Sequence, residues 1–191
     1  MARQNWRASN MLYPVPAVLV GCRDEEGRDN LLTAAWAGTI CSDPVMVSVS
    51  IRKERYSHDI IENTGEFTIS LTTVSLARAT DLCGVRSGRD IDKFAQTKLT
   101  RLESERIKAP GVAESPVVLE CRVKQILRLG SLDRFSADVV NVSVDERYLD
   151  NKGRVELEKA MLIAYSHGEY FGLGEKIGKF GYSVRRRPKK R

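Results

Sequence analysis

Residues 33–57 read TAAWAGTICSDPVMVSVSIRKERYS, and this stretch predicts more about the fold than any other part of the chain. It predicts a strand, a turn at Asp43-Pro44 and a second strand. The second strand alternates apolar residues with small or polar ones, which is the period of two expected of a half-buried strand. Its apolar face consists of Val45, Val47, Val49 and Ile51. One face of this strand therefore belongs to the core.

A group of cations follows the second strand directly. Arg52, Lys53 and Arg55 come after its last core residue, and Ser57 is the expected N-cap of a helix over residues 57–63. Cationic side chains and the free N–H groups of a helix start would then meet at one place, which is the chemistry of a phosphate site. The alternative is a solvated loop whose serine only caps its helix, and both interpretations stay open at this point.

The rest of the chain predicts a protein that is mainly β with short helices. A hairpin joins residues 17–22 to the strand that begins at Thr33, and Gly65 ends the first helix before a strand over residues 67–71. Further expected elements are a helix from Thr73 or Ser75 to about Gly84, an irregular excursion over residues 85–114, two long strands, and a last core strand over residues 162–165. Because strands outnumber helices, we expect an antiparallel barrel.

The two long strands differ in their patterns. In the first, one face is predicted to be apolar and the other, which carries Glu120, to face solvent. The apolar face would hold Leu119, Cys121, Val123, Leu127 and Leu129. In the second, the apolar parity changes between Val139 and Val140, which predicts a β-bulge there.

Composition and charge narrow the class of protein. The chain has 191 residues, 42% hydrophobic and 29% charged, which suits one folded domain. Six of its 31 basic residues lie in residues 185–191, which leaves 25 basic residues against 25 acidic ones in the rest. The four cysteines are scattered without a C-x-x-C pair, so we expect each to be a small, buried or half-buried apolar residue, with neither a metal site nor disulfides. Without an apolar run long enough to span a membrane, and without a signal core, a cytoplasmic location is expected.

The order and spacing of several motifs resemble the flavin reductase-like, FMN-binding split-barrel family, and within it the flavoredoxin and archaeal ferric reductase branch. The resemblance covers about residues 10–184. The matching motifs are residues 30–36, Asp43-Pro44, and residues 51–57, 60–67, 87–94, 170–175 and 181–183. The resemblance implies an antiparallel split β-barrel, with a flavin reductase-like FMN-binding domain over residues 1–184 and a basic disordered tail over residues 185–191.

The resemblance also implies where FMN binds, noncovalently and at a dimer interface. One strand would run beside the isoalloxazine ring: Thr33, Ala34, Ala35, Trp36, Ala37, Gly38 and Thr39. The end of the next strand and the cations after it would hold the rest of the cofactor, with the phosphate on the last four: Ser50, Ile51, Arg52, Lys53, Arg55 and Ser57. Trp36 has an alternative role as a core tryptophan.

Two further residues are candidates at the flavin. Lys93 resembles the family's lysine near the pyrimidine edge, where a cation favours the reduced anionic flavin and raises its reduction potential. Its alternative is an ordinary surface lysine. His167 is a weak candidate for an acid or base in the pocket, but hydride transfer to flavin N5 does not require a protein acid. The catalytic residues therefore stay unassigned.

Two classes of function compete. The first is an FMN-binding oxidoreductase or electron-transfer flavoprotein, a homodimer that reduces flavin, ferric iron or another acceptor with electrons from NAD(P)H or a protein donor. Residues 172–178 miss the dinucleotide fingerprint by one residue, so a nicotinamide substrate would bind over the flavin face. The second is a nucleic-acid-binding module that uses the basic tail. The neutral net charge of the rest of the chain argues against this function. A flavin-free heme or pyridoxal-phosphate relative on the same barrel is a third alternative.

Overall fold

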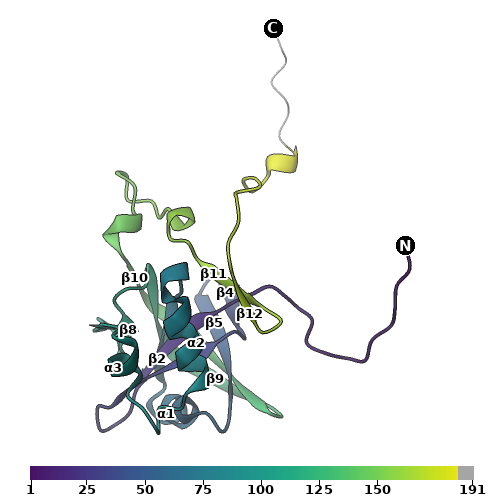
Figure 1. Ribbon diagram of the computed structural model, residues 1–191. Helices are drawn as coiled ribbons and strands as arrows, with labels where there is room; N and C mark the ends of the chain where they lie inside the picture. Colours follow the sequence, from purple (N-terminus) through teal and green to yellow (C-terminus); the bar gives the residue numbers. More distant parts are fainter. Residues whose placement is uncertain (185–191) are drawn as a thin grey trace.

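A seven-stranded antiparallel sheet forms the body of the protein in the computed structural model, which describes residues 1–184 (Figure 1). Its strand order is β3-β2-β6-β9-β10-β5-β4. The strands are β2 (Val18–Arg23), β3 (Asp29–Ala34), β4 (Ala37–Ser42), β5 (Val45–Arg52), β6 (Glu66–Leu71), β9 (Val117–Leu129) and β10 (Leu132–Val144). The mainly β class that the sequence predicts is confirmed.

The two edge strands of this sheet, β3 and β4, are neighbours in the sequence. The chain leaves β3 after Ala34, passes through Ala35 and Trp36, and starts β4 at Ala37. At this break the N–H of Ser50 in β5 donates to the carbonyl oxygen of Trp36 at 2.8 Å. The sheet therefore curls until its edges meet at one point, which is a split barrel. The single strand expected from Thr33 is wrong, because the chain crosses here from one edge of the sheet to the other.

Short helices and small sheets surround the barrel (Figure 1). The helices are α1 (Tyr56–Thr64), α2 (Ala77–Val85), preceded by a 3-10 turn over Val74–Leu76, and α3 (Lys93–Thr97), with further 3-10 turns at Glu146–Tyr148, Leu157–Lys159 and Tyr182–Val184. The remaining strands are β1 (Val15–Pro16), β7 (Arg101–Leu102), β8 (Gly111–Val112), β11 (Ile163–Ser166) and β12 (Glu169–Gly172). Gly65 ends α1 with a φ of 69°, as predicted. Arg55 occupies the N-cap position without a side-chain bond, so the capping role predicted for Ser57 is wrong.

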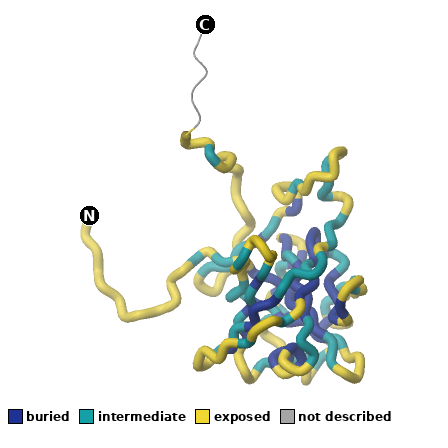
Figure 2. The backbone as a smooth tube through the Cα atoms, turned by 180° about the vertical axis from the view of Figure 1, so that it is seen from behind, coloured by how far each residue is buried: buried dark blue, intermediate teal, exposed yellow. Residues whose placement is uncertain are grey.

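Buried residues concentrate in the body of the protein (Figure 2). Two clusters of buried side chains hold this body together, and the barrel interior forms the larger one. There, Val47, Val49 and Ile51 of β5 pack with Phe67 and Phe135, both fully buried. Val45, predicted to share this face, is 51% exposed at the start of the strand, so the prediction is wrong for that residue. The second cluster lies under α2 and α3, where Leu19, Leu31 and Phe94 meet. Each large apolar side chain buried in this way contributes about 1.5–3 kcal/mol to stability. The second cluster anchors α3 to the outside of β2 and β3.

The cysteines behave as small apolar residues, as the sequence predicts. Cys22, Cys83 and Cys121 are buried, and burial raises the pKa of Cys22 to about 12 and that of Cys83 to about 11. Thiols with such pKa values stay protonated at neutral pH. They therefore contribute packing.

The pairing of β9 with β10 contains two register shifts. One lies between Val139 and Asn141, which confirms the predicted bulge. The other leaves Lys124 as an extra residue, so that Ile126 turns toward the core while Leu127 and Leu129 are 40% and 49% exposed. The apolar face predicted for this strand is therefore wrong beyond Val123, because one inserted residue exchanges the two faces of a strand.

The segment expected to be an irregular excursion carries α3, β7 and β8, and β8 packs against β2, β6 and β9. It covers Glu120, which is 3% exposed although the sequence predicts a solvent-facing position. The Glu120 carboxylate accepts hydrogen bonds from Asn141 Nδ2 at 2.8 Å and from the backbone N–H groups of Glu105 and Arg106 at 3.0 and 2.7 Å. Burial acts to raise the pKa of Glu120, but these hydrogen bonds outweigh it and the pKa is lowered.

Both ends of the described chain extend away from the barrel (Figures 1 and 2). We call residues 1–12 and 173–184 the terminal arms. Large apolar side chains on them are strongly exposed, including Trp6 at 76%, Leu12 at 87% and Ile177 at 91%. No helix within residues 1–184 has the length and apolarity needed to cross a membrane. The predicted basic tail, residues 185–191, lies outside the described residues.

Candidate functional site

A cavity of about 140 Å³ lies where β3, the start of α1 and the segment from α2 to α3 meet. We call it the anion cavity. Arg55, Arg86 and Lys93 bring three cations to it, and Glu54 brings one carboxylate. Its other lining residues are Asn30, Leu32, Tyr56, Ser57, Ser87 and Gly88. The first N–H groups of α1 also lie here, so both side chains and the helix dipole favour a bound anion.

In the part of the chain that the structure describes, the three cations of this cavity lack acidic partners. Within residues 1–184, no ion pair involves Arg55, Arg86 or Lys93. Lys93 is 3% exposed, and its Nζ donates to the carbonyl oxygens of Leu31 at 2.6 Å and Cys83 at 2.8 Å. Burial lowers the pKa of Lys93, and an anion bound beside it would restore the charged form. The alternative that Lys93 is an ordinary surface lysine is wrong.

Ser57 lies at the wall of the anion cavity and is buried. Asn30 Nδ2 donates to Ser57 Oγ at 2.7 Å, so the Ser57 hydroxyl hydrogen remains available to another acceptor. Sequence reasoning missed Asn30 as a site residue, along with Arg86 and Ser87. Asn30 and Ser87 both lie inside the motifs that carry the family resemblance, and their position in these motifs could have identified them as site residues.

The predicted phosphate group divides into two in the structure. Arg55 and Ser57 line the anion cavity, whereas Arg52 and Lys53 are exposed and lie outside its lining. Arg52 pairs with Glu54 at 3.7 Å, and Lys53 lies 3.7 Å from the buried Asp133. The residues before them play other parts, since Ile51 is buried in the barrel core and Ser50 closes the barrel through its N–H.

The strand predicted to run beside a flavin ring borders an aromatic cluster. Trp36 is half-buried, and its ring centroid lies 6.0 Å from that of Tyr13. Tyr13 in turn lies 4.8 Å from His167, an exposed residue in the turn between β11 and β12. Thr33 and Ala35 are half-buried, Ala34 packs in the core, Ala37 is half-buried, and Gly38 and Thr39 are exposed. This edge offers both aromatic surface and free backbone to a flat ligand.

Gly88 fits the wall of the anion cavity because it has no side chain. A Cβ at this position would lie 2.1 Å from Asn30 Oδ1 and 2.9 Å from Tyr56 Cδ1. We expect Gly88→Ala to lower the free energy of unfolding by about 1–3 kcal/mol, since overpacking forces its neighbours to move. Urea unfolding measures the change, with Gly174→Ala as control because a Cβ there meets nothing within 4 Å. Equal stability of the two variants would contradict the tight packing of this wall.

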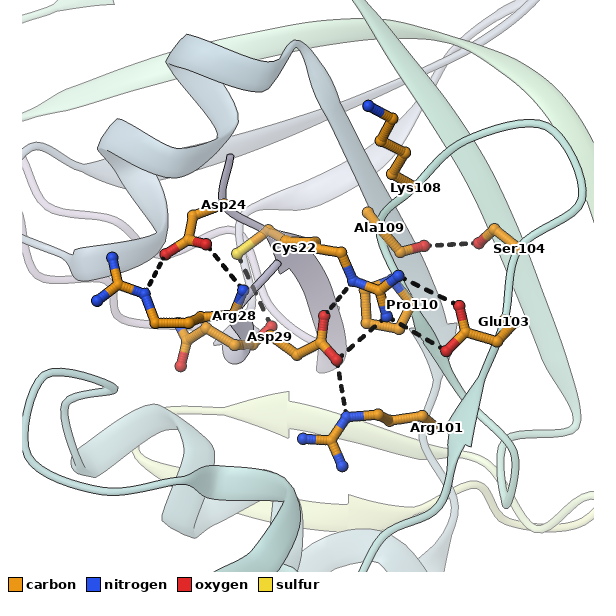
Figure 3. Close-up of polar contacts among 12 residues, drawn as sticks. Cys22, Asp24, Arg28, Asp29, Arg101, Glu103, Ser104, Lys108, Ala109 and Pro110 are labelled. Atoms are coloured by element: carbon orange, nitrogen blue, oxygen red, sulfur yellow. Dashed lines mark hydrogen bonds and ion pairs between the residues drawn. The ribbon is translucent and has the colours of Figure 1, made fainter. Parts of the chain in front are cut away.

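A network of ion pairs fixes the segments around the anion cavity (Figure 3). The Asp29 carboxylate in β3 accepts hydrogen bonds from Arg23 at 2.6 Å and from Arg101 at 2.7 Å. The Arg101 guanidinium also lies 4.4 Å from the ring centroid of Phe94, the neighbour of Lys93. Asp29 therefore connects the strand that carries Asn30 to the helix that carries Lys93.

A second polar cluster lies on α1 outside the anion cavity. His58, Asp59 and Glu62 place three possible metal-ligating atoms within 4.8 Å of one another. His58 Nε2 lies 2.9 Å from Asp133, however, and Arg128 pairs with both Asp133 and Glu62. These contacts join α1 to the β9–β10 hairpin.

A comparison with family models matches the flavin reductase like domain to residues 10–174. The chain belongs to this family. Its structure superposes on flavoredoxin of Desulfovibrio vulgaris (Miyazaki F) with a TM-score of 0.89 and 32% identity, over 96% of this chain and 100% of that one. A Thermus thermophilus FMN-binding protein, solved with bound 1-cyclohex-2-enone, matches with a TM-score of 0.78 and 26% identity, over 94% and 97% of the two chains. An Archaeoglobus fulgidus protein is 29% identical over 81% of this chain and 86% of its own length.

Membership in the flavin reductase-like family confirms the resemblance found in the sequence and the split-barrel fold. It assigns the chain a flavin-related redox function and a flavin cofactor. The identities of the particular flavin, the electron donor and the acceptor have to be inferred from the residues of the site.

Proposed function

We propose that this protein binds FMN and acts as an FMN-dependent oxidoreductase or electron-transfer flavoprotein. The observation that carries the proposal is the anion cavity, where Arg55, Arg86 and Lys93 lack acidic partners within residues 1–184. Of the three, Lys93 is buried, and a buried cation without a counter-charge is costly; a terminal phosphate supplies that charge. The similarity to flavoredoxin and to an FMN-binding protein supports the same choice.

The residues present fit FMN in three ways. Arg55 offers paired N–H donors, Ser57 offers a hydroxyl hydrogen, and the start of α1 offers backbone N–H groups to the phosphate. The half-buried Trp36 and the backbone of residues 33–39 would lie along the ring. When bound, the flavin supplies the capacity to accept a hydride or electrons and to pass them on.

This proposal gives Lys93 a role in phosphate binding, in addition to the role near the flavin pyrimidine edge that the family resemblance implies. It lines the same cavity as Arg55 and Ser57, so its removal would affect phosphate binding. The expectation that its charge raises the flavin potential stays a prediction, and so does the minor pocket role of His167.

The electrons are proposed to come from NADH, NADPH or a protein donor. Anaerobic mixing of the FMN-loaded protein with each nicotinamide distinguishes these cases, because a direct donor bleaches the flavin absorption. Bleaching by neither nicotinamide would assign the protein to the electron carriers that depend on a protein donor. Flavin or ferric iron can then be tested as acceptors by reoxidation.

We expect the protein to be a homodimer. The terminal arms expose large apolar side chains to solvent in the single chain, and burying them favours association with a second copy. Light scattering is expected to give twice the chain mass of 21.4 kDa. A mass of one chain would contradict the dimer. A protein that lacks residues 1–12 and still has the mass of two chains would show that the N-terminal arm does not hold the dimer together.

The flavin content of the purified protein tests the proposed function most simply. We expect visible flavin absorption, or uptake of one FMN per chain by the apoprotein. A protein that takes up no FMN at any concentration would overturn the proposal. The nucleic-acid alternative rests on residues outside the described chain, and the proposed cytoplasmic location awaits a cell-fractionation experiment.

A further inference from the structure

His58, the residue after Ser57, is buried in the first turn of α1 but lies outside the lining of the anion cavity. It is 4% exposed, and its ring packs edge-on against Phe135 of the barrel core, with the ring centroids 5.3 Å apart. Its backbone N–H donates to the carbonyl oxygen of Arg55 at 2.9 Å. His58 therefore connects the barrel core to the part of α1 that borders the anion cavity.

A buried carboxylate holds the His58 ring in place. Asp133 in β10 is fully buried, and its Oδ2 lies 2.9 Å from His58 Nε2. Burial acts to raise the pKa of Asp133, but the contacts with His58 and Arg128 outweigh it and the pKa is lowered. The ionised carboxylate only accepts hydrogen bonds, so His58 Nε2 is the donor. The other oxygen, Asp133 Oδ1, has no hydrogen-bond partner within residues 1–184, so the carboxylate depends on His58 and Arg128.

Contacts from distant strands fix the first turn of α1. The N-cap residue, Arg55, makes no side-chain hydrogen bond to this turn, so a local cap does not orient it. Instead, Asn30 of β3 donates to Ser57 Oγ at 2.7 Å, and Asp133 of β10 holds His58. The two strands are not neighbours in the sheet, and their contacts act on consecutive residues of the helix. Together they determine how the Ser57 hydroxyl and the N–H groups at the start of α1 face the anion cavity.

From this arrangement we infer that His58 is a positioning residue for flavin binding, because its hydrogen bond to Asp133 holds the first turn of α1 in the orientation that binds the flavin phosphate. The inference rests on the proposed function, which places this phosphate in the anion cavity. His58 lies outside the cavity lining, so it does not itself contact the phosphate. It acts through Arg55, Ser57 and the backbone N–H groups beside them, whose hydrogen bonds weaken steeply when their direction changes.

The test compares the dissociation constants of FMN and riboflavin in fluorescence titrations of each apoprotein. We expect His58→Ala to weaken FMN binding roughly five- to tenfold, as the loss of one hydrogen bond does, and to leave riboflavin binding unchanged. His58→Gln keeps an N–H group that can reach Asp133 and should restore most of the affinity for FMN. His58→Asn is polar but too short for this contact, so it should show the same loss as His58→Ala and replaces that variant if it does not fold. Glu120→Ala is the matched control, because it also removes a buried hydrogen-bonding side chain but lies outside the lining of the anion cavity.

The possible results separate this inference from the proposed function. If the variants without the contact to Asp133 bind FMN as wild type does, or lose affinity for FMN and riboflavin equally, His58 only stabilises the fold and the inference alone fails. If His58→Gln binds FMN as weakly as His58→Asn, the hydrogen bond to Asp133 is not the cause and the inference also fails. The same selective loss in Glu120→Ala would attribute the effect to lower stability and would likewise overturn the inference. Failure of FMN to bind the wild-type protein would overturn the proposed function itself, and the inference with it.

Discussion

Replacing Arg55 by alanine is expected to weaken FMN binding by roughly 10- to 100-fold while leaving riboflavin binding unchanged. Arg55 is half-buried at the anion cavity and has no acidic partner within residues 1–184. A hydrogen bond to a charged group contributes about 1.5–3 kcal/mol, which corresponds to this loss of affinity. Riboflavin lacks the phosphate, so it does not sense the substitution.

Arg52→Ala is the matched control for this prediction. Arg52 lies three residues before Arg55, but it is exposed, pairs with Glu54 at 3.7 Å and lies outside the lining of the anion cavity. Its removal should leave the affinity for FMN unchanged in a flavin fluorescence titration. If Arg52→Ala lowers the affinity for FMN more than Arg55→Ala does, the phosphate binds at Arg52 and Lys53 instead of in the anion cavity.

Glu120→Ala is expected to lower the free energy of unfolding by about 3 kcal/mol at neutral pH. The substitution removes the buried acceptor of three donors, namely Asn141 Nδ2 and the N–H groups of Glu105 and Arg106. Glu120→Gln keeps one carbonyl oxygen as acceptor and should lose clearly less. Urea unfolding measures both variants, and a loss for Glu120→Ala within the range of ordinary surface substitutions would contradict the account of this contact.

The lowered pKa of Glu120 also predicts a pH dependence of stability. Above the unfolded-state pKa, near the ordinary value of 4.5, the carboxylate is charged in both states and its full contribution is present. As the pH falls below 4.5 toward the lower native pKa, the unfolded state binds the proton first and the contribution is lost. Wild type should therefore lose more stability than Glu120→Gln between neutral pH and the acid side of this range. If the free energies of unfolding of wild type and Glu120→Gln change in parallel with pH, the lowered pKa of Glu120 is contradicted.

Local patterns predicted much of this fold. The alternation in residues 45–51 predicted β5 and the core positions of Val47, Val49 and Ile51, and Gly65 ended α1 where expected. The parity change at Val139 gave the bulge in β10. In each case the cause lies in neighbouring residues, either the two-residue period of a strand or the freedom of glycine at positive φ.

The errors arose where distant segments decide the structure. The insertion at Lys124 depends on how β9 pairs with β10, and no pattern within β9 alone reveals it. Glu120 is buried because residues 105 and 106 cover it from another part of the chain. Ser57 is not the cap because α1 already begins at Tyr56, and the Ser57 hydroxyl inside the first turn accepts a hydrogen bond from Asn30, 27 residues earlier.

The candidate site was predictable in part, because short motifs supply some of its residues while the folded chain brings in others. Arg55, Ser57 and Lys93 were chosen from two separate motifs, and the structure brings all three to one cavity. Arg52 and Lys53 were predicted together with them, but both are exposed and lie outside the lining of this cavity, so their part in phosphate binding stays a prediction. Arg86 enters the cavity from the end of α2, a contact that only the folded chain creates.

The ratio of affinities for FMN and riboflavin tests the central claim most directly, because the two ligands differ only in the phosphate. Titration of the wild-type apoprotein at one ionic strength gives both dissociation constants. The account predicts that FMN binds about 100-fold more tightly or better, since several charged hydrogen bonds are made to the phosphate. Equal dissociation constants for FMN and riboflavin would show that the anion cavity does not hold the phosphate and would contradict the account.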